Sequence, residues 1–412
     1  DLSEIEEELL PYAGILQSVL GIIDTEHYGY GELFNEINVH TGGIGTSLEL
    51  YTDVTKVKEK EFRATFEIKG KALYPKLDVL FAMMREILME SKLGDEKRLK
   101  EILSMLKTRL QTSFLSAGHT TAVLRSLSYT SPIARFRDIT SGIGFYEVVK
   151  DLEENFEERK ELLIENLKKI AGRIFRKENL MLSYTSAQEG LAVLEKAVPQ
   201  FADSLHTGEK ESHGQCIIHC KKRNEGFRTS SKVQYVARTG NFIDGGAEYT
   251  GALQILKVIL SYDYLWQNVR VKGGAYGCMS GFNRIGEGYL VSYRDPNLEK
   301  TMEIYEGVVD YLKNFDIDDR DMNKFIIGTI SNLDRPMNPA AKGSRSLNLY
   351  MNRITEEMIR REREQILDAQ QEDIRGLATV LEAVLAAGEL CVIGSEEKIE
   401  EAKEMFGEIR TL

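Results

Sequence analysis

The order of helices and strands expected in the first half of the chain recurs in the second half. Expected helices over 10–22 and 25–37, the second entered through the capping residues Asp24 and Thr25, lead into alternating strands over 38–53 and 61–73. A helix over 77–88, helical segments to about residue 167, a strand over 179–186 and a helix to about residue 205 complete the unit. This order predicts helices packed on one face of a hairpin-rich sheet.

The second half presents the same elements in the same order. Strands over about 215–222 and 231–238 flank a turn at 223–226, and apolar residues at steps of three and four mark a helix over 249–264. The segments NVRVKGGAYGCMSGFN and GEGYLVSYRD follow, then a helix over 302–312, a strand over 388–395 and a last helix. Asn38-Val39 before Gly42-Gly43 thus has its counterpart in Asn268-Val269 before Gly273-Gly274.

We therefore predict an α+β protein of two homologous domains, each with a mainly antiparallel sheet covered by helices. The polar segment 206–215 separates the copies, which divides the 412 residues into domains at 1–207 and 208–412. The chain opens on an acidic helical stretch, DLSEIEEELL, with no strand before it. We expect the first domain to lack its first strand and the chain to be a piece of a longer protein.

Composition argues against several classes of partner. The chain has 53 basic and 65 acidic side chains, and its net charge of -12 does not favour nucleic acid. No apolar run approaches the roughly 20 residues that cross a bilayer, so no membrane contact is expected. The 4 scattered cysteines form no disulfide framework and fit a reducing compartment, the cytoplasm or, as an alternative, the mitochondrial matrix.

Zinc-type side chains gather near the predicted linker without forming a convincing metal site. His213, Cys216, His219 and Cys220 lie within a short stretch, but in a strand QCIIHC would turn the two cysteines to one face and His219 to the other. Buried cysteines beside an exposed histidine are therefore favoured over zinc. His206, Glu209 and Lys210 nearly match an inverted zincin motif, with lysine where the second imidazole is needed. We predict no metal ligands in this chain.

The stretch VRVKGGAYG, residues 269–277, places three glycines around Tyr276 with Arg270 just upstream. The glycines could simply end a helix and permit a bulge. They could also cradle a phosphate, but they follow a helix, and neither G-K-[ST] nor G-x-G-x-x-G is present. Open main chain beside a guanidinium and a phenol suits a third ligand, a peptide, whose carbonyl oxygens both groups could bind.

The same stretch, followed by GEGYLVSYRDPNLEKT, resembles the C-terminal half of the presequence protease branch of the pitrilysin and insulinase zinc metallopeptidases, the inverzincins. The resemblance extends to HTGGIGTSLELYTD in the first copy and to KKRNEGFRTSSKVQYVARTG at the start of the second, so it covers essentially the whole chain. It implies two half-shells joined by a helical hairpin, each holding two homologous α+β domains. This chain would contain the third and fourth domains.

The resemblance also implies a division of labour between the halves. The inverted zinc motif would belong to the N-terminal half, which would precede Asp1, while Tyr276 and Arg270 would contact the substrate carbonyl or oxyanion beside the zinc. The backbone of Gly273, Gly274, Ala275 and Gly277 would approach the substrate. The full-length protein would be a zinc metalloendopeptidase that degrades unstructured peptides in a closed chamber. This chain would form the chamber wall and be inactive alone, with the N-terminal half and peptide substrates as its partners.

Two other readings of the duplicated halves remain open. The chain could be a non-catalytic peptidase-like subunit, a partner-binding or assembly module such as those found in this superfamily, or a peptide-binding module that acts alone. The presence of both Arg270 and Tyr276 favours the catalytic partner half, because a purely structural subunit does not need donors to a transition state. The net charge fits both an acidic chamber wall that favours basic peptides and an ordinary solvated surface.

Overall fold

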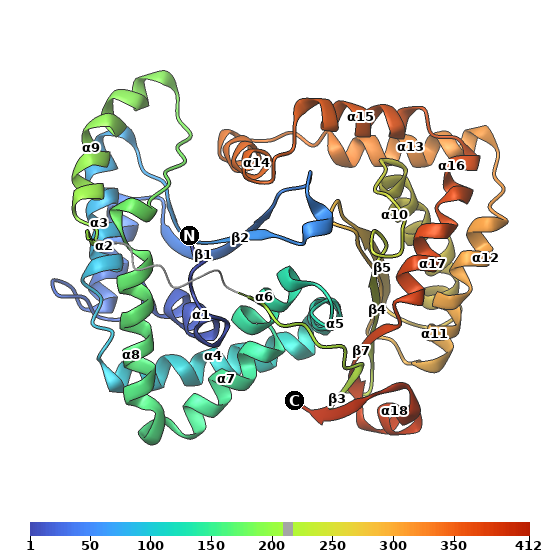
Figure 1. Cartoon of the computed structure of the whole chain (residues 1–412), viewed down its shortest axis with the longest axis horizontal. Coiled ribbons are helices and arrows are strands. Elements are labelled where there is room, and N and C mark those ends of the chain that lie inside the picture. Colours follow the sequence, from blue (N-terminus) through green and yellow to red (C-terminus); the bar gives the residue numbers. More distant parts are fainter. Residues whose placement is uncertain (209–216) are drawn as a thin grey trace.

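A computed structural model of the chain describes residues 1–208 and 217–412. The chain forms two lobes, with the blue-to-green first half on one side and the yellow-to-red second half on the other (Figure 1). Helices dominate both lobes, and strands form one two-stranded and one six-stranded sheet among the described residues. The predicted α+β class is confirmed.

The first lobe is mainly helical. Its only described sheet is a hairpin in which every residue from Ile44 to Thr52 has an antiparallel partner between Phe62 and Gly70. The elements are α1 (Leu10–Val19), α2 (Tyr30–His40), β1 (Ile44–Thr52), β2 (Phe62–Gly70), α3 (Leu77–Met89), α4 (Glu96–Ser116), α5 (Gly118–Leu127), α6 (Pro132–Ser141), α7 (Ile143–Glu154), α8 (Phe156–Ile174) and α9 (Leu191–Asp203).

The second lobe is built on the six-stranded sheet. Its strand order is β5-β6-β4-β7-β3-β8, antiparallel except that β3 runs parallel to both β7 and β8. The elements are β3 (Glu225–Thr229), β4 (Tyr235–Asn241), α10 (Ala252–Tyr262), a π-helix (Trp266–Val271), β5 (Gly277–Phe282), β6 (Glu287–Tyr293), α11 (Glu299–Glu306), α12 (Val308–Lys313), α13 (Asp319–Leu333), α14 (Pro339–Met351), α15 (Glu356–Leu367), α16 (Gln371–Gly376), α17 (Ala378–Ala386), β7 (Glu389–Ser395), α18 (Glu396–Glu401) and β8 (Glu408–Thr411).

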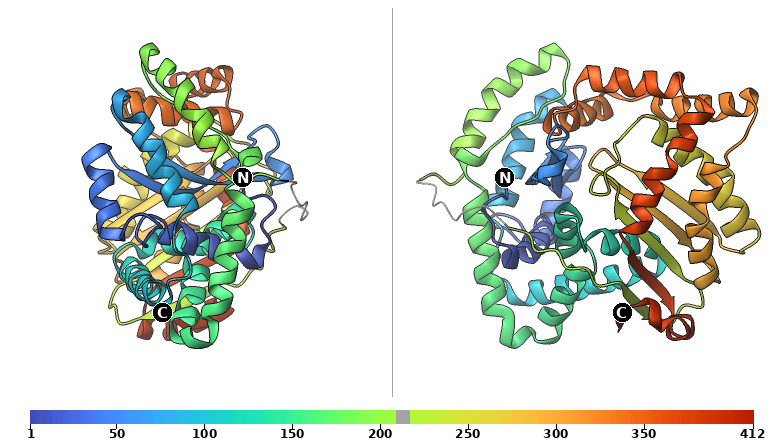
Figure 2. Two further views of the ribbon diagram at one scale, coloured as in Figure 1. Left: turned by 90° about the vertical axis from the view of Figure 1, so that its left-hand side faces the viewer. Right: turned by 45° about the vertical axis from the view of Figure 1, so that its right-hand side comes forward.

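This sheet is buried on both faces, so its strands are apolar at consecutive positions rather than at alternate ones. Tyr235 and Ala237 of β4 join the core of the first lobe, whereas Val236 between them joins the core of the second. Helix α5 of the first lobe covers the first face, and α10, α11 and α17 cover the second. Figure 2 shows these helices, coloured from yellow to red, on the outer side of the sheet. The two halves therefore pack on opposite faces of one sheet.

A buried ion-pair network joins the halves across the first of these faces. The Arg125 guanidinium in α5 donates from Nε to Glu225 Oε2 at 2.6 Å, and from Nη1 to Asp138 Oδ2, also at 2.6 Å. All three side chains are at most 2% exposed. Burial alone raises the pKa of a carboxyl group, but the hydrogen bonds from Arg125 outweigh it and lower the pKa of Glu225. The network therefore fixes the position of α5 and α6 of the first half relative to β3 of the sheet.

The hairpin β1–β2 crosses the space between the lobes, and its tip is tied to the second half (Figure 1). The Thr52 N–H donates to Asn352 Oδ1 at 2.7 Å, and the Lys60 ammonium lies 2.7 Å from Asp244. Along the outer edge of β2, the Leu2 N–H donates to the Ala64 carbonyl at 2.8 Å.

The two glycine pairs that the sequence aligned have the same local structure. In each half a helix ends, a Gly-Gly pair follows, and the second glycine has a positive φ before the first strand of an antiparallel hairpin. These are Gly43, with φ of 108°, before β1, and Gly274, with φ of 82°, before β5. A side chain disfavours that backbone conformation, which explains glycine at both positions.

Several predicted elements differ from the structure. The predicted strand over 179–186 is not formed, and the described residues 217–222 of the predicted strand over 215–222 are not a strand either. The sheet instead begins with Glu225–Thr229, so Glu225 and Gly226 pair with β7 rather than form a turn. A strand-like residue pattern is not sufficient, because a strand also needs a neighbour to accept its hydrogen bonds.

The start of the second helix is also later than predicted. Helix α2 begins at Tyr30, whose N–H donates to Asp24 Oδ1 at 2.8 Å, so Asp24 binds the helix end from outside it. Thr25 instead bridges to Ser91. The domain boundary at 207/208 adjoins residues outside the described range and stays a prediction. None of the described helices is long and apolar enough to cross a membrane.

Candidate functional site

The predicted substrate loop lies between the π-helix and the edge strand β5. A π-helix is rare and tends to occur at functional sites, and here it contains Trp266, Arg270 and Val271. Directly after it, a Cβ at Gly273 would lie 2.4 Å from the Val269 carbonyl oxygen, so the chain can turn this tightly only with glycine. This turn leads within a few residues from the helix to the first residue of β5, Gly277.

Three consecutive backbone N–H groups of this loop are already used inside the protein. Gly274 donates to the Arg270 carbonyl at 2.8 Å, Ala275 to Val269 at 3.1 Å and Tyr276 to Tyr293 at 3.1 Å. Ala275 is also 4% exposed. A phosphate cradle needs N–H groups that point at the ligand, so this loop does not suit a phosphate. The groups it presents outward are side chains.

The turn after β6 holds the glycine loop in place. The Asn297 side-chain amide donates to the Gly273 carbonyl at 2.6 Å, and its backbone N–H donates to Asp295 Oδ1 at 2.9 Å. Burial raises the pKa of Asp295, and the hydrogen bond from the Thr301 hydroxyl opposes that rise. Because β5 and β6 are paired, the residues after β6 lie beside those before β5.

Arg270 is a cation without a carboxylate partner among the described residues. Its guanidinium lies over the ring of Trp266, 3.9 Å from the ring centroid, and no described acidic side chain forms an ion pair with it. Stacking on an indole steadies the guanidinium while its N–H donors stay free in the plane. The nearby Cys278 thiol has a pKa raised to about 11 by burial, and Arg270 partly offsets that rise.

Tyr276 points into solvent from an aromatic cluster. It is 69% exposed, and its ring packs edge-on against Tyr293 with centroids 5.9 Å apart. Tyr293 also contacts Tyr235 and, from α5 of the first half, His119, whose ring centroid is 4.9 Å from that of Tyr293. Burial lowers the pKa of His119. Its Nδ1 has no hydrogen-bond partner among the described residues. The cluster therefore fixes the base of the Tyr276 ring and leaves its hydroxyl exposed.

The sequence singled out Arg270 and Tyr276, and the structure places Arg270 in the π-helix and Tyr276 directly before β5, at the two ends of the glycine turn. It did not single out Trp266, Tyr293, His119 or Asn297. The sequence motif S-Y-R-D-P-N could have identified Tyr293 and Asn297, because pairing of β5 with β6 places this segment beside the glycines. No local pattern could have found His119, which reaches the site from the other half of the chain.

The zinc-type residues near the linker that the structure describes do not come together. His219 Nδ1 lies 2.8 Å from Glu7 Oε2, and Cys220 is half-buried, with a thiol pKa that burial raises. His213 and Cys216, with Glu209 and Lys210 of the second motif, lie outside the described residues. Within the described residues, no three His, Cys, Asp or Glu side chains are grouped to hold a metal ion.

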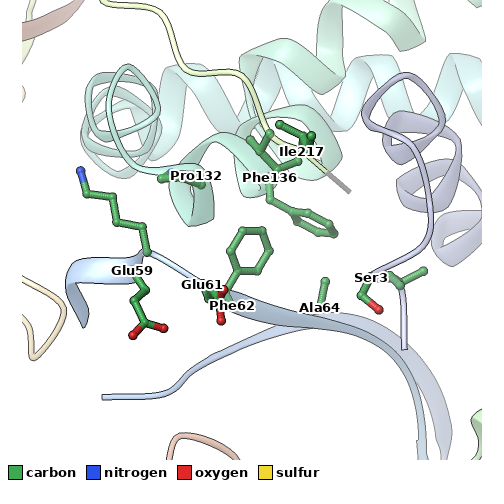
Figure 3. Close-up of a pocket in the computed structure, with 11 residues that line it drawn as sticks. Ser3, Glu59, Glu61, Phe62, Ala64, Pro132, Phe136 and Ile217 are labelled. Carbon is green, nitrogen blue, oxygen red and sulfur yellow. The ribbon is translucent and has the colours of Figure 1, made fainter. Parts of the chain in front are cut away.

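A pocket of about 280 Å³ lies elsewhere, between the start of β2, α6 and residues 217–218 (Figure 3). Two of the side chains that line it, Phe62 and Phe136, pack edge-on at 5.8 Å, and Glu59 and Glu61 also belong to its lining. It contains neither Arg270 nor Tyr276. Its lining offers no nucleophile and base in contact, so the exposed loop is the better candidate site.

Two family models match the chain. The model for the region associated with subfamily C of the M16 peptidases matches residues 1–152, and the model described as PreP C-terminal domain matches residues 224–396. Protein HypA of Clostridium perfringens is 37% identical over all of this chain, which covers 42% of that protein. Presequence protease 1, chloroplastic/mitochondrial, of Arabidopsis thaliana is 29% identical over 98% of this chain and 37% of that protein. The chain thus spans about two fifths of the length of these relatives.

Solved structures share the fold at low sequence identity. A peptidase M16 inactive domain from Pseudomonas fluorescens aligns with a TM-score of 0.59 and 13% identity, over 95% of this chain and 90% of that one. Pitrilysin aligns with a TM-score of 0.56 and 13% identity, over 93% of this chain but 38% of its own. The same two-lobed fold therefore accounts for most of the Pseudomonas fluorescens chain, whereas it is only part of the longer pitrilysin chain.

Proposed function

The chain belongs to the M16 peptidase family and matches the C-terminal half of its presequence protease branch, and from this premise we propose that it is the substrate-contacting half of a zinc metalloendopeptidase. The observation that carries the proposal is the loop at 269–277. It presents an exposed phenol and a guanidinium that has no carboxylate partner among the described residues, both on a rigid support. Both groups donate hydrogen bonds, and a peptide carbonyl that becomes an oxyanion accepts them.

In this proposal each residue of the loop has a separate role. Arg270, steadied on Trp266, binds and orients a substrate carbonyl, and the Tyr276 hydroxyl donates to the oxygen on which negative charge develops. An extended peptide can approach the backbone because Gly273, Gly274 and Gly277 have no side chains to block it. The buried Ala275 side chain anchors the loop to the core.

The described residues of this chain do not fit a zinc ion, since they contain no suitable group of ligands. We assign the metal, which would activate the attacking water, to the N-terminal half of a longer polypeptide. The substrates would be unstructured peptides enclosed between the halves. The Arabidopsis relative is named as chloroplastic or mitochondrial and the Saccharomyces cerevisiae one as mitochondrial, while for this chain a reducing compartment stays a prediction.

The test compares three samples: this chain alone, the protein segment encoded upstream of Asp1, and the two mixed or joined. Each is supplied with zinc and given an internally quenched unstructured peptide as substrate. We expect no cleavage by the chain alone and cleavage by the combined protein. Tyr276→Phe should lower turnover roughly 10²–10³-fold with the unfolding midpoint unchanged. Tyr262→Phe is the matched control, because that tyrosine is 70% exposed and lies outside the loop.

Three results would contradict the proposal in different ways. Full activity of the Tyr276→Phe enzyme would remove the oxyanion role. Cleavage by this chain alone would mean that it contains a metal site. A combined protein that is folded but inactive would favour the alternative, a non-catalytic peptidase-like subunit, which the fold shared with the inactive M16 domain also suits.

A further inference from the structure

Beside Tyr276 the structure presents a second exposed cation, Arg294, in an unusual backbone conformation. Its φ of 48° lies in the left-handed region, which a residue with a side chain adopts only at an energetic cost. Among the described residues, non-glycine residues with positive φ are few, and strain of this kind gathers at binding sites.

The strained backbone of Arg294 is coupled directly to the candidate site. Its carbonyl oxygen accepts a hydrogen bond from the Tyr276 N–H at 3.3 Å, alongside the carbonyl of Tyr293 at 3.1 Å. Its guanidinium lies 5.5 Å from the centroid of the Tyr293 ring, the same ring that packs against Tyr276. Arg294 is therefore linked to Tyr276 through its backbone and lies against the Tyr293 ring that also packs on Tyr276.

The Arg294 guanidinium is held but not neutralised. The hydroxyl of Tyr235, together with those of Tyr293 and Tyr276, raises its pKa, so it stays charged at every physiological pH. No described carboxylate forms an ion pair with it, although the chain has 65 acidic side chains. The buried neighbour Asp295 bonds instead to Thr301 and Asn297. An exposed, ordered arginine without a described acidic partner matches a carboxylate supplied by a ligand.

We propose that Arg294 is a specificity-determining residue that binds a carboxylate of the peptide held at Tyr276. The carboxylate can come from an acidic side chain or from the C-terminus of the peptide, since both have the same chemistry. This inference rests on the proposed function, because it takes the ligand at Tyr276 to be a peptide. It adds a preference for peptides with an acidic group next to the residues that Arg270 and Tyr276 contact.

The test titrates the full chain with three short unstructured peptides of glycine, serine, alanine and leucine, all acetylated at the N-terminus. One has a free C-terminal carboxylate, one is amidated, and one is amidated with a single internal glutamate. The chain has 1 tryptophan, Trp266, and it stacks on Arg270, so its fluorescence reports occupancy of the loop. Each peptide is titrated into the native chain, Arg294→Gln and Arg353→Gln.

Arg353→Gln is the matched control. Arg353 also has a left-handed φ, 58°, and its guanidinium lies 5.7 Å from the centroid of the Tyr350 ring, but it follows the end of α14 and does not belong to the loop. Both variants replace an arginine at positive φ by glutamine, so their unfolding midpoints should change alike.

We expect Arg294→Gln to bind at least one carboxylate peptide roughly tenfold more weakly and the neutral amidated peptide as the native chain does. Whether the free C-terminus or the glutamate is affected identifies the source of the carboxylate. Equal loss for all three peptides, or no loss, would overturn the inference and leave the proposed function standing. If the native chain bound none of the peptides, the inference would fail together with the peptide-binding role of the loop.

Discussion

The side-chain amide of Asn297 donates a hydrogen bond to the carbonyl oxygen of Gly273 across 2.6 Å. This bond joins the turn after β6 to the glycines before β5, and Asp295 holds Asn297 in place from the other side. The turn after β6 therefore supports the glycine loop that is proposed to contact substrate.

Asn297→Ala should lower kcat/KM of the combined enzyme by about tenfold and stability by about 1 kcal/mol, since the Gly273 carbonyl loses its partner. Peptide cleavage and urea unfolding measure the two effects. Asn297→Asp is the informative companion, because a carboxylate cannot donate to a carbonyl oxygen and should be no better than alanine. Unchanged kinetics in both variants would show that the loop does not need this bond.

Gly274→Ala should cost about 1–2 kcal/mol of stability, because an alanine at φ of 82° is strained even though only Pro296 Cγ lies near its Cβ, at 3.6 Å. Gly43→Ala, at φ of 108° with nothing within 4 Å, provides the equivalent change in the first half. Thermal unfolding should show similar losses for both, whereas peptide cleavage should fall specifically with Gly274→Ala. A similar loss of cleavage in both variants would mean that stability alone explains the effect.

Arg125→Met should destabilise the chain by about 3–5 kcal/mol, because Glu225 and Asp138 would remain buried without their cation. The double variant Arg125→Met with Glu225→Gln should recover part of that loss. Equilibrium unfolding in urea provides both values. Lys398→Ala, which removes an exposed ion pair with Glu401, should have no measurable effect. If Arg125→Met alone were as stable as the native chain, the stabilising role of the network would be contradicted.

Acid should destabilise the chain partly through His119. Burial lowers the pKa of His119, so the unfolded chain binds its proton at a higher pH than the folded chain does. The free energy of unfolding should therefore fall as pH drops below about 6.5, the pKa of an unperturbed histidine. His119→Gln should make this decline shallower between about pH 7 and about 5.5, as measured by urea unfolding at each pH. An identical slope in the variant would exclude His119 as its source.

The sequence by itself determined the fold class and the two glycine pairs, one of them in the loop at 269–277, whereas the division into two homologous domains stays a prediction. These features are local: periodicity marks helices and strands, and a left-handed backbone before a hairpin requires glycine, so Gly43 and Gly274 are visible in both copies. Arg270 and Tyr276 could be named for the same reason, because they bracket the glycines.

Only the tertiary structure decided which segments pair and what surrounds the loop. The residues 179–186 and 217–222 were predicted as strands, yet they form none here, because strand formation depends on a neighbour distant in sequence. Trp266 under Arg270, Asn297 on Gly273 and His119 against Tyr293 likewise result from packing. Arg125 in one half and Glu225 in the other meet because both halves bury one sheet between them, and such contacts leave no periodic trace in the sequence.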